Sequence, residues 1–286
     1  MFRILVTTLA ALAGLAFGSF LNVCLARWPA GESIVKPRSH CRACNRTLAW
    51  WEYVPLLSWL ALRGRCRTCG APISLRYPLV ELLVAALWGI ACSHLWPALV
   101  DSPAPLAVLT DLIGLLALLW LLVALGALDA EHFWLPNKLT VPGILLGLAF
   151  TSAHESFSDH FDTAAKPLRA LLGGIVAALV AAGIILLIRW VYWLLRRQEG
   201  IGMGDAKLMA MLGAWLGLPG ALLAFGIGMV LGAIFALLVL ARPRRASESW
   251  ATTRLPLGTF LSIGGVVSAL WGPQLVAAYL RWSGLA

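Results

Sequence analysis

Charged residues are scarce in this sequence. Only 12% of its 286 residues are Asp, Glu, Lys or Arg, and no more than 13 are acidic. Ordinary globular domains contain about 25% charged residues, so the composition argues against a large soluble core. Hydrophobic residues make up 60% of the chain instead. We therefore expect a polytopic membrane protein that is all-α, with no soluble domain of ordinary size between its spans.

Signals for nucleic-acid binding are also missing. The net charge is +9, but no nucleic-acid motif accompanies it, and in a membrane protein basic residues report topology first. No glycine-rich nucleotide loop follows a predicted strand. The first apolar run has no clear cleavage site and is too long for a signal-peptide core, so we interpret it as a retained span.

Apolar stretches long enough to cross a bilayer occur about eight times. Their approximate limits are residues 4–26, 77–99, 106–128, 138–154, 168–195, 201–218, 220–241 and 256–280. The segment from Arg27 to Arg76 contains nine Lys or Arg and two acids, and Arg242, Arg244, Arg245 and Arg254 follow a later span on the same side. The positive-inside rule then predicts external termini and a cytoplasmic loop. Counting the spans places Asp129 and Asp205 on the cytoplasmic side.

The basic loop contains the most specific motif in the chain. Two C-x-x-C pairs are separated by 21 residues and comprise Cys41, Cys44, Cys66 and Cys69. Four thiolates on two tight turns can complete a tetrahedral zinc shell with no position left for water, so the predicted role is structural. Free thiols or two local disulfides are the alternative. His40 is either a spare ligand or, more simply, a solvated loop histidine.

Residues 200–208 read GIGMGDAKL and place an acid at the mouth of an apolar run. Burying an acid at the centre of a bilayer costs about 2.5–3.5 kcal/mol, so Asp205 is a candidate functional residue. Gly202 and Gly204 have no side chain and would allow another backbone to approach it. Alternatively, Asp205 only caps the helix that follows.

A second carboxylate occupies an equivalent place. Asp129 ends an apolar stretch, and Pro136 and Asn137 then turn the chain back towards the membrane. Asp at a helix C-terminus opposes the helix dipole, which favours a functional role. Glu131 is its nearest competitor. Two close carboxylates share a proton and can activate water, as in aspartic proteases.

Two further charged residues are candidates for supporting the substrate or the loop. Lys207 either acts on Asp205 or extends its amine to the membrane surface. Glu81, near the start of the second apolar stretch, either pairs with an arginine of the loop or contacts substrate. The residues themselves do not decide between these readings.

A series of motifs resembles the type IV prepilin leader peptidases over most of the chain. These are GSFLNV from Gly18, GESIVKPRSHC from Gly31, PLLSWL from Pro55, RGRC from Arg63, RYPLVEL from Arg76, LPN from Leu135, GMGD from Gly202 and PLGTFL from Pro256. Family members often have an acid in place of Asn137, so the resemblance says least about Asn137 and Glu131.

The resemblance implies a bifunctional enzyme of the bacterial inner membrane. It would cut the basic leader of prepilins or pseudopilins on the cytoplasmic side with Asp129 and Asp205, and methylate the new N-terminus with S-adenosylmethionine. The expected partners are these substrates and membrane lipid. The expected domains are a first span at 1–26, a zinc-binding loop at 27–76 and a peptidase domain at 77–286.

Two other functions remain open at this point. A peptidase-only relative shares the Gly-x-Gly-Asp arrangement, although the four-cysteine loop argues against it. A non-enzymatic transporter or assembly scaffold could instead use the carboxylate pair as a proton or cation site.

Overall fold

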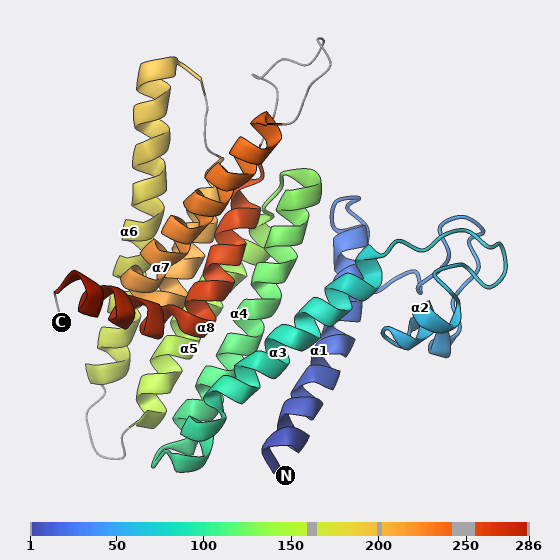
Figure 1. Ribbon diagram of the computed structural model, residues 1–286, viewed down its shortest axis with the longest axis horizontal. Helices are drawn as coiled ribbons and strands as arrows, with labels where there is room; N and C mark the ends of the chain where they lie inside the picture. Colours follow the sequence, from blue (N-terminus) through green and yellow to red (C-terminus); the bar gives the residue numbers. More distant parts are fainter. Residues whose placement is uncertain (1, 159–164, 199–201, 242–254, 285–286) are drawn as a thin grey trace. The chain divides into compact units, whose positions relative to one another are not determined.

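The structure is a computed structural model, and it describes residues 2–158, 165–198, 202–241 and 255–284 (Figure 1). Gly200 and Ile201 of the glycine-rich stretch lie outside the described residues, as do the four arginines at 242–254. The described part of the chain is helical, as predicted, and contains only two isolated β-bridges, both in the basic loop.

Two compact units divide the chain, residues 1–101 and 102–286. The three domains expected from the sequence are functional divisions, at 1–26, 27–76 and 77–286, and they stay a prediction. In the first unit, α1 (Phe2–Arg27) packs on α3 (Arg76–Asp101), and the loop between them contains the short helices η1 (Trp50–Tyr53) and α2 (Leu57–Ala61).

Glycines bring α1 and α3 into close contact. A Cβ added at Gly14 would lie 2.7 Å from the Cα of Ala85, and one at Gly18 would lie 2.7 Å from the Cα of Glu81. This small-xxx-small spacing lets two membrane helices approach with their backbones nearly touching. Glu81 therefore faces α1 across the tightest part of the pair.

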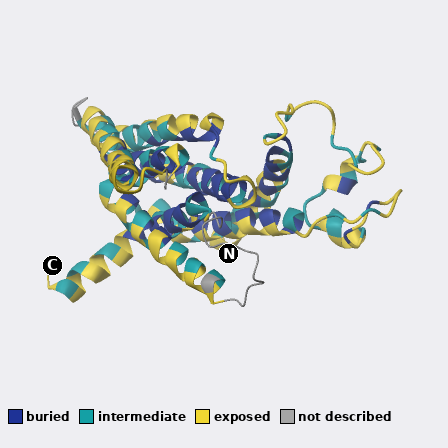
Figure 2. Cartoon of the chain, turned by 90° about the horizontal axis from the view of Figure 1, so that it is seen from above, coloured by how far each residue is buried: buried dark blue, intermediate teal, exposed yellow. Residues whose placement is uncertain are grey.

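The second unit is a bundle of α4 (Pro105–His132), α5 (Asn137–Ser158), α6 (Ala165–Arg196), α7 (Met203–Leu240) and α8 (Leu257–Ser283). Leu118, Leu122, Leu125 and Leu212 are almost fully buried within it. In Figure 2 the buried positions follow the inward faces of the helices. Outward faces stay apolar, which is expected of a protein surrounded by lipid.

Helix α7 changes direction at Gly217, whose φ of 66° and ψ of 178° are not helical. Before this point α7 runs along α5, with Met211 against Gly143 and Trp215 against Gly147. After it, Gly220 lies near Ser268 of α8, and later residues approach the start of α8. The two halves therefore run in opposite directions, and the apolar stretches predicted at 201–218 and 220–241 are two arms of one bent helix.

Six described helices are long and apolar enough to cross a membrane. The count is smaller than the eight predicted stretches because both arms of α7 belong to one helix and α5 is not among the six. The polytopic all-helical prediction is confirmed. The chain is a multi-pass membrane protein.

Candidate functional site

Asp129 lies near the end of α4 and is buried, with 6% of its surface exposed. Its Oδ2 accepts a 2.8 Å hydrogen bond from the backbone N–H of Thr259 and lies 3.2 Å from the Thr259 hydroxyl. That hydroxyl also donates to the carbonyl of Gly126 at 3.0 Å. Because Thr259 is in the first turn of α8, the positive end of that helix faces the carboxylate and stabilises its negative charge.

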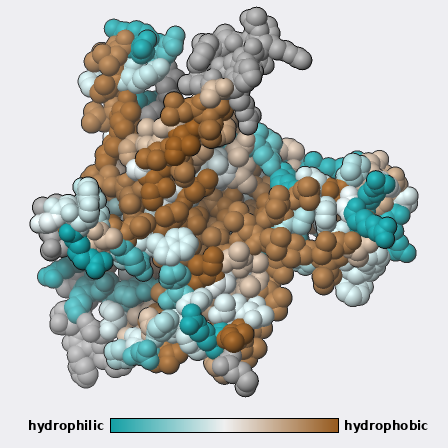
Figure 3. Space-filling model, in the orientation of Figure 1, coloured by the Kyte–Doolittle hydropathy of each residue, from teal (hydrophilic) through white to brown (hydrophobic). Residues whose placement is uncertain are grey.

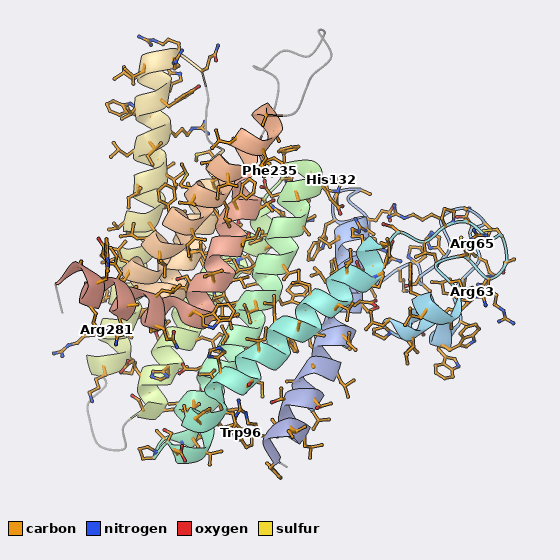
Figure 4. All side chains as sticks on the ribbon, viewed as in Figure 1. Arg63, Arg65, Trp96, His132, Phe235 and Arg281 are labelled. Atoms are coloured by element: carbon orange, nitrogen blue, oxygen red, sulfur yellow. The ribbon has the colours of Figure 1, made fainter. Side chains whose placement is uncertain are left out.

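The neighbouring acid is in a different environment. Glu131 is exposed, and its Oε2 lies 3.8 Å from Nε2 of His132. Figure 4 shows His132 at the tip of α4. Between the two acids at this helix end, Asp129 is therefore the one enclosed by other helices.

Asp205 is in the first turn of α7 and is 8% exposed. Its Oδ2 accepts a 3.2 Å hydrogen bond from the N–H of Gly202. The helix-capping interpretation is therefore correct as far as it goes. This hydrogen bond engages Oδ2, and the described residues leave Oδ1 to take part in chemistry.

Leu135 connects the surroundings of the two aspartates. Its Cβ would lie 2.9 Å from a Cβ added at Gly204, and its Cδ1 would lie 2.9 Å from one added at Gly258. The Gly258 position is also 2.9 Å from Cγ of Asp129. Both carboxylates therefore lie at the same end of the second unit, and the charge of Asp129 acts electrostatically on Asp205.

The remaining predicted support residues separate into two places. Lys207 donates a 2.6 Å hydrogen bond to Oδ1 of Asn137 at the start of α5, so its amine is engaged by the LPN turn. Glu81 lies in the first unit, where its Oε2 accepts a 2.8 Å hydrogen bond from the N–H of Leu56. The partner of Glu81 in the loop is therefore the backbone of Leu56, in place of the arginine that was one expectation.

The four cysteines come together. Their Sγ atoms all lie within 4.8 Å of one another, and those of Cys41 and Cys69 are 3.8 Å apart. Sulfurs in a tetrahedral zinc shell with 2.3 Å bonds are about 3.8 Å apart. All four thiols are free of disulfides. The cluster therefore fits a metal ion.

The two cysteine turns have the same local construction. Asn45 donates its N–H to the carbonyl of Cys41, and Gly70 donates to that of Cys66, each with a positive φ. Backbone N–H groups of Cys69 and Thr68 lower the pKa of Cys66 to about 6, which favours the thiolate that binds metals. The backbone thus prepares a metal-binding form of the thiol.

Polar contacts support the first turn, and His40 is not among the residues that form the cluster. Arg46 makes a two-pronged ion pair with buried Glu52, with N···O distances of 2.6 and 3.0 Å. Glu52 also accepts the N–H of Ala49 at 2.7 Å. Nδ1 of His40 contacts the carbonyl of Arg38 at 3.1 Å, so the solvated-loop interpretation fits this histidine.

Comparison with known proteins gives two family matches. Residues 12–95 match the Bacterial Peptidase A24 N-terminal domain, and residues 116–237 match the Type IV leader peptidase family. A relative from Stutzerimonas stutzeri, named prepilin leader peptidase/N-methyltransferase, is 34% identical over 96% of this chain and 94% of its own length. The chain belongs to the type IV leader peptidase family.

Other relatives carry similar names. A prepilin leader peptidase/N-methyltransferase from Myxococcus xanthus is 42% identical over 84% of this chain, which spans 65% of that relative. An Escherichia coli protein named type 4 prepilin-like proteins leader peptide-processing enzyme is 36% identical over 91% of this chain and 92% of its own length. No solved structure matches the chain significantly.

The family region includes both aspartates and Leu135, but it ends at residue 237, before α8. Thr259 and Gly258 were not assigned a role from the sequence, although they lie within the PLGTFL motif. The sequence signal that could have found them is the proline and glycine of this motif, which precede an apolar helix. What could not be seen was that this helix start faces a carboxylate 130 residues earlier in the chain.

Proposed function

We propose that this protein is a membrane aspartic endopeptidase that removes the basic leader of type IV prepilins or pseudopilins. The observation that carries the proposal is the pair of buried carboxylates, Asp129 and Asp205, at one end of the second unit of a chain of this family. The peptidase activity belongs to the predicted domain at 77–286, which contains both.

The two aspartates have different roles in this proposal. Asp129 accepts a short N–H bond at the positive end of α8, so it is the ionised base that takes a proton from water. Asp205 accepts one longer hydrogen bond, from the N–H of Gly202, so in this proposal it holds the shared proton.

Peptide cleavage then balances without a covalent intermediate. The water oxygen bonds to the carbonyl carbon of the last residue of the leader while its proton passes to Asp129. Asp205 donates its proton to the carbonyl oxygen, which stabilises the tetrahedral intermediate. When the C–N bond breaks, the departing amine receives the proton held by Asp129, and the carbonyl oxygen returns its proton to Asp205.

Two glycines beside the carboxylates leave no room for a side chain. Gly204 and Gly258 leave space for Leu135 and for the Asp129 carboxylate, and a methyl group at either would collide with them. We assign Gly202 the supporting role of holding Asp205 through its N–H. Lys207 orients the turn at Asn137.

The second activity is N-methylation of the new N-terminus, which the relatives' names support. S-adenosylmethionine would supply the methyl group. The described residues contain no strand followed by a glycine-rich loop, so they do not fit a conventional nucleotide site. We therefore assign no residue to the binding of S-adenosylmethionine.

The four cysteines hold a structural zinc ion in this proposal. Cys41, Cys44, Cys66 and Cys69 would form a closed shell that stabilises a loop with little hydrophobic core. The protein would reside in the bacterial inner membrane with the active site towards the cytoplasm. The excess of basic residues between Arg27 and Arg76 supports this orientation.

Prepilin cleavage in membranes tests the proposal. Asp129→Asn and Asp205→Asn keep the side-chain size and remove the titrating proton, so both variants should lose cleavage at matched protein levels. Methylation of a pre-cleaved pilin should continue. Normal cleavage by either variant removes that aspartate from the mechanism. Normal cleavage by both, with altered ion coupling, indicates a transporter or scaffold.

A further inference from the structure

The basic loop presents an apolar surface that the peptidase and metal sites do not use. It consists of Trp50 and Tyr53 on η1 and Leu57 and Leu60 on α2, which are 71%, 44%, 66% and 63% exposed. We propose that this surface, the η1–α2 patch, lies in the headgroup layer of the lipid bilayer and docks the loop on the membrane.

The patch does not belong to the loop's own interior. Glu52, which lies between its aromatic residues, points inward to Arg46, and Trp59 donates its ring N–H to the carbonyl of Ile73 at 3.2 Å. Both short helices therefore have one face turned inward and an apolar face turned outward. Figure 3 shows apolar surface on the α2 side of the loop and hydrophilic atoms at its outer edge.

A hydrogen bond fixes the depth of the patch. The N–H of Leu56, directly before α2, donates to Glu81 at 2.8 Å. Glu81 is five residues inside α3, about 7–8 Å along the helix axis, and side chains lean towards the helix start. Leu56 therefore lies beside the first two turns of a membrane-spanning helix.

The partner helix gives the same depth. Glu81 lies opposite Gly18, which is nine residues before the end of α1 at Arg27. Nine helical residues correspond to about 13 Å. Because both α1 and α3 extend past this level towards the loop, α2 is located at the membrane boundary.

The surrounding chemistry suits an anionic lipid surface. Arg63, Arg65 and Arg67 follow α2 and are exposed, whereas Glu52 is neutralised by Arg46. Figure 4 shows Arg63 and Arg65 on this loop. Amphipathic helices with Trp or Leu on one face and arginines nearby insert into the boundary between headgroups and acyl chains.

Lipid is the occupant we choose over a second protein because the apolar surface continues on α3. Leu79, Leu82 and Leu83, which flank Glu81 in sequence, are 60%, 49% and 48% exposed. Apolar side chains at this level of a spanning helix face lipid. The η1–α2 patch extends that surface sideways onto the loop.

Photo-crosslinking to lipid tests the inference. The full chain is reconstituted in vesicles of phosphatidylethanolamine and phosphatidylglycerol, without substrate. A benzophenone amino acid replaces Trp50, Leu60 or, as the control, Thr68, which is exposed on the second cysteine turn. We expect several-fold more labelled lipid at positions 50 and 60 than at 68, because only the former lie in the bilayer boundary.

Two results overturn the proposal. One is equal lipid labelling at positions 50, 60 and 68 in variants that migrate as wild type on gel filtration. The other is a patch that crosslinks to an added prepilin at the expense of lipid, which would make it a substrate surface. If the variant at position 60 fails to insert, the benzophenone amino acid is placed at position 57 and the measurement is repeated.

Discussion

The hydrogen bond from the backbone N–H of Thr259 to Asp129 offers the sharpest test of which aspartate is ionised and which is protonated. Replacing Thr259 with Pro removes the N–H that lies 2.8 Å from Oδ2. The position is in the first turn of α8, where proline is tolerated. Losing this donor destabilises the ionised carboxylate and also removes the longer, 3.2 Å hydrogen bond from the same N–H to the carbonyl of Pro256.

The size of the effect follows from the bond. A hydrogen bond to a charged group contributes about 1.5–3 kcal/mol, and one pH unit corresponds to about 1.4 kcal/mol. If Asp129 must be ionised for cleavage, the acid side of the rate profile should move up by about one to two pH units. At pH values well above this acid limb, the cleavage rate should change little.

The assay is initial-rate cleavage of a prepilin in reconstituted vesicles across a range of pH. Thr259→Val is the matched control, because it keeps the N–H and removes only the hydroxyl, whose nearer acceptor is the carbonyl of Gly126. Because the hydroxyl lies 3.2 Å from Oδ2 of Asp129 and is shared with that carbonyl, the acid limb of this control should move less than that of the proline variant. A proline variant that is folded and follows the wild-type profile would refute the assignment of Asp129 as the ionised base.

Three further predictions concern packing and the loop. Gly258→Ala places a methyl group 2.9 Å from Cγ of Asp129 and should lower the cleavage rate about a hundredfold, as a displacement of about 1 Å does. Gly226→Ala, with nothing within 4 Å of the new methyl group, should retain the rate in the same assay. Cys66→Ser, or chelation of the metal, should make the loop more sensitive to protease in vesicles, and equal digestion with and without metal would contradict a structural ion. Glu52→Gln should also loosen the loop. The ion pair holds the pKa of Glu52 below its usual range, so this stabilisation is complete above the ordinary carboxylate range and is lost as the pH falls through the lowered pKa. Limited proteolysis at falling pH should therefore separate wild type from the variant only at the higher pH values.

The sequence predicts the helices well because membrane spans are encoded locally. Length and hydropathy locate the apolar stretches. The described helices differ at Gly217, where one glycine reverses α7 without a loop, and at α5, which is not among the helices apolar enough to span. The cysteine cluster is also a local signal, because the two C-x-x-C turns contain all of its ligands.

Contacts between distant segments could not be predicted in the same way. The sequence favoured Asp129 but left Glu131 as a competitor, and burial of Asp129 against α8 distinguishes the two acids. Glu81 was expected to pair with an arginine of the loop or to contact substrate; its partner in the loop is the N–H of Leu56, and contact with substrate stays a prediction. In both cases the deciding partner is a backbone N–H, a donor that every residue other than proline has, so residue identity carries no signal for it.

Because α7 reverses direction, its two arms contact the surroundings of both aspartates. Its first arm carries Asp205 in its first turn, and its second arm returns to the start of α8, where a Cβ added at Gly228 would lie 3.1 Å from the Cα of Leu261. Leu261 is two residues from the donor that holds Asp129. The second arm therefore contacts the helix that holds Asp129, while the first arm carries Asp205. One bent helix thus supports the surroundings of both acids, although only one of them belongs to it.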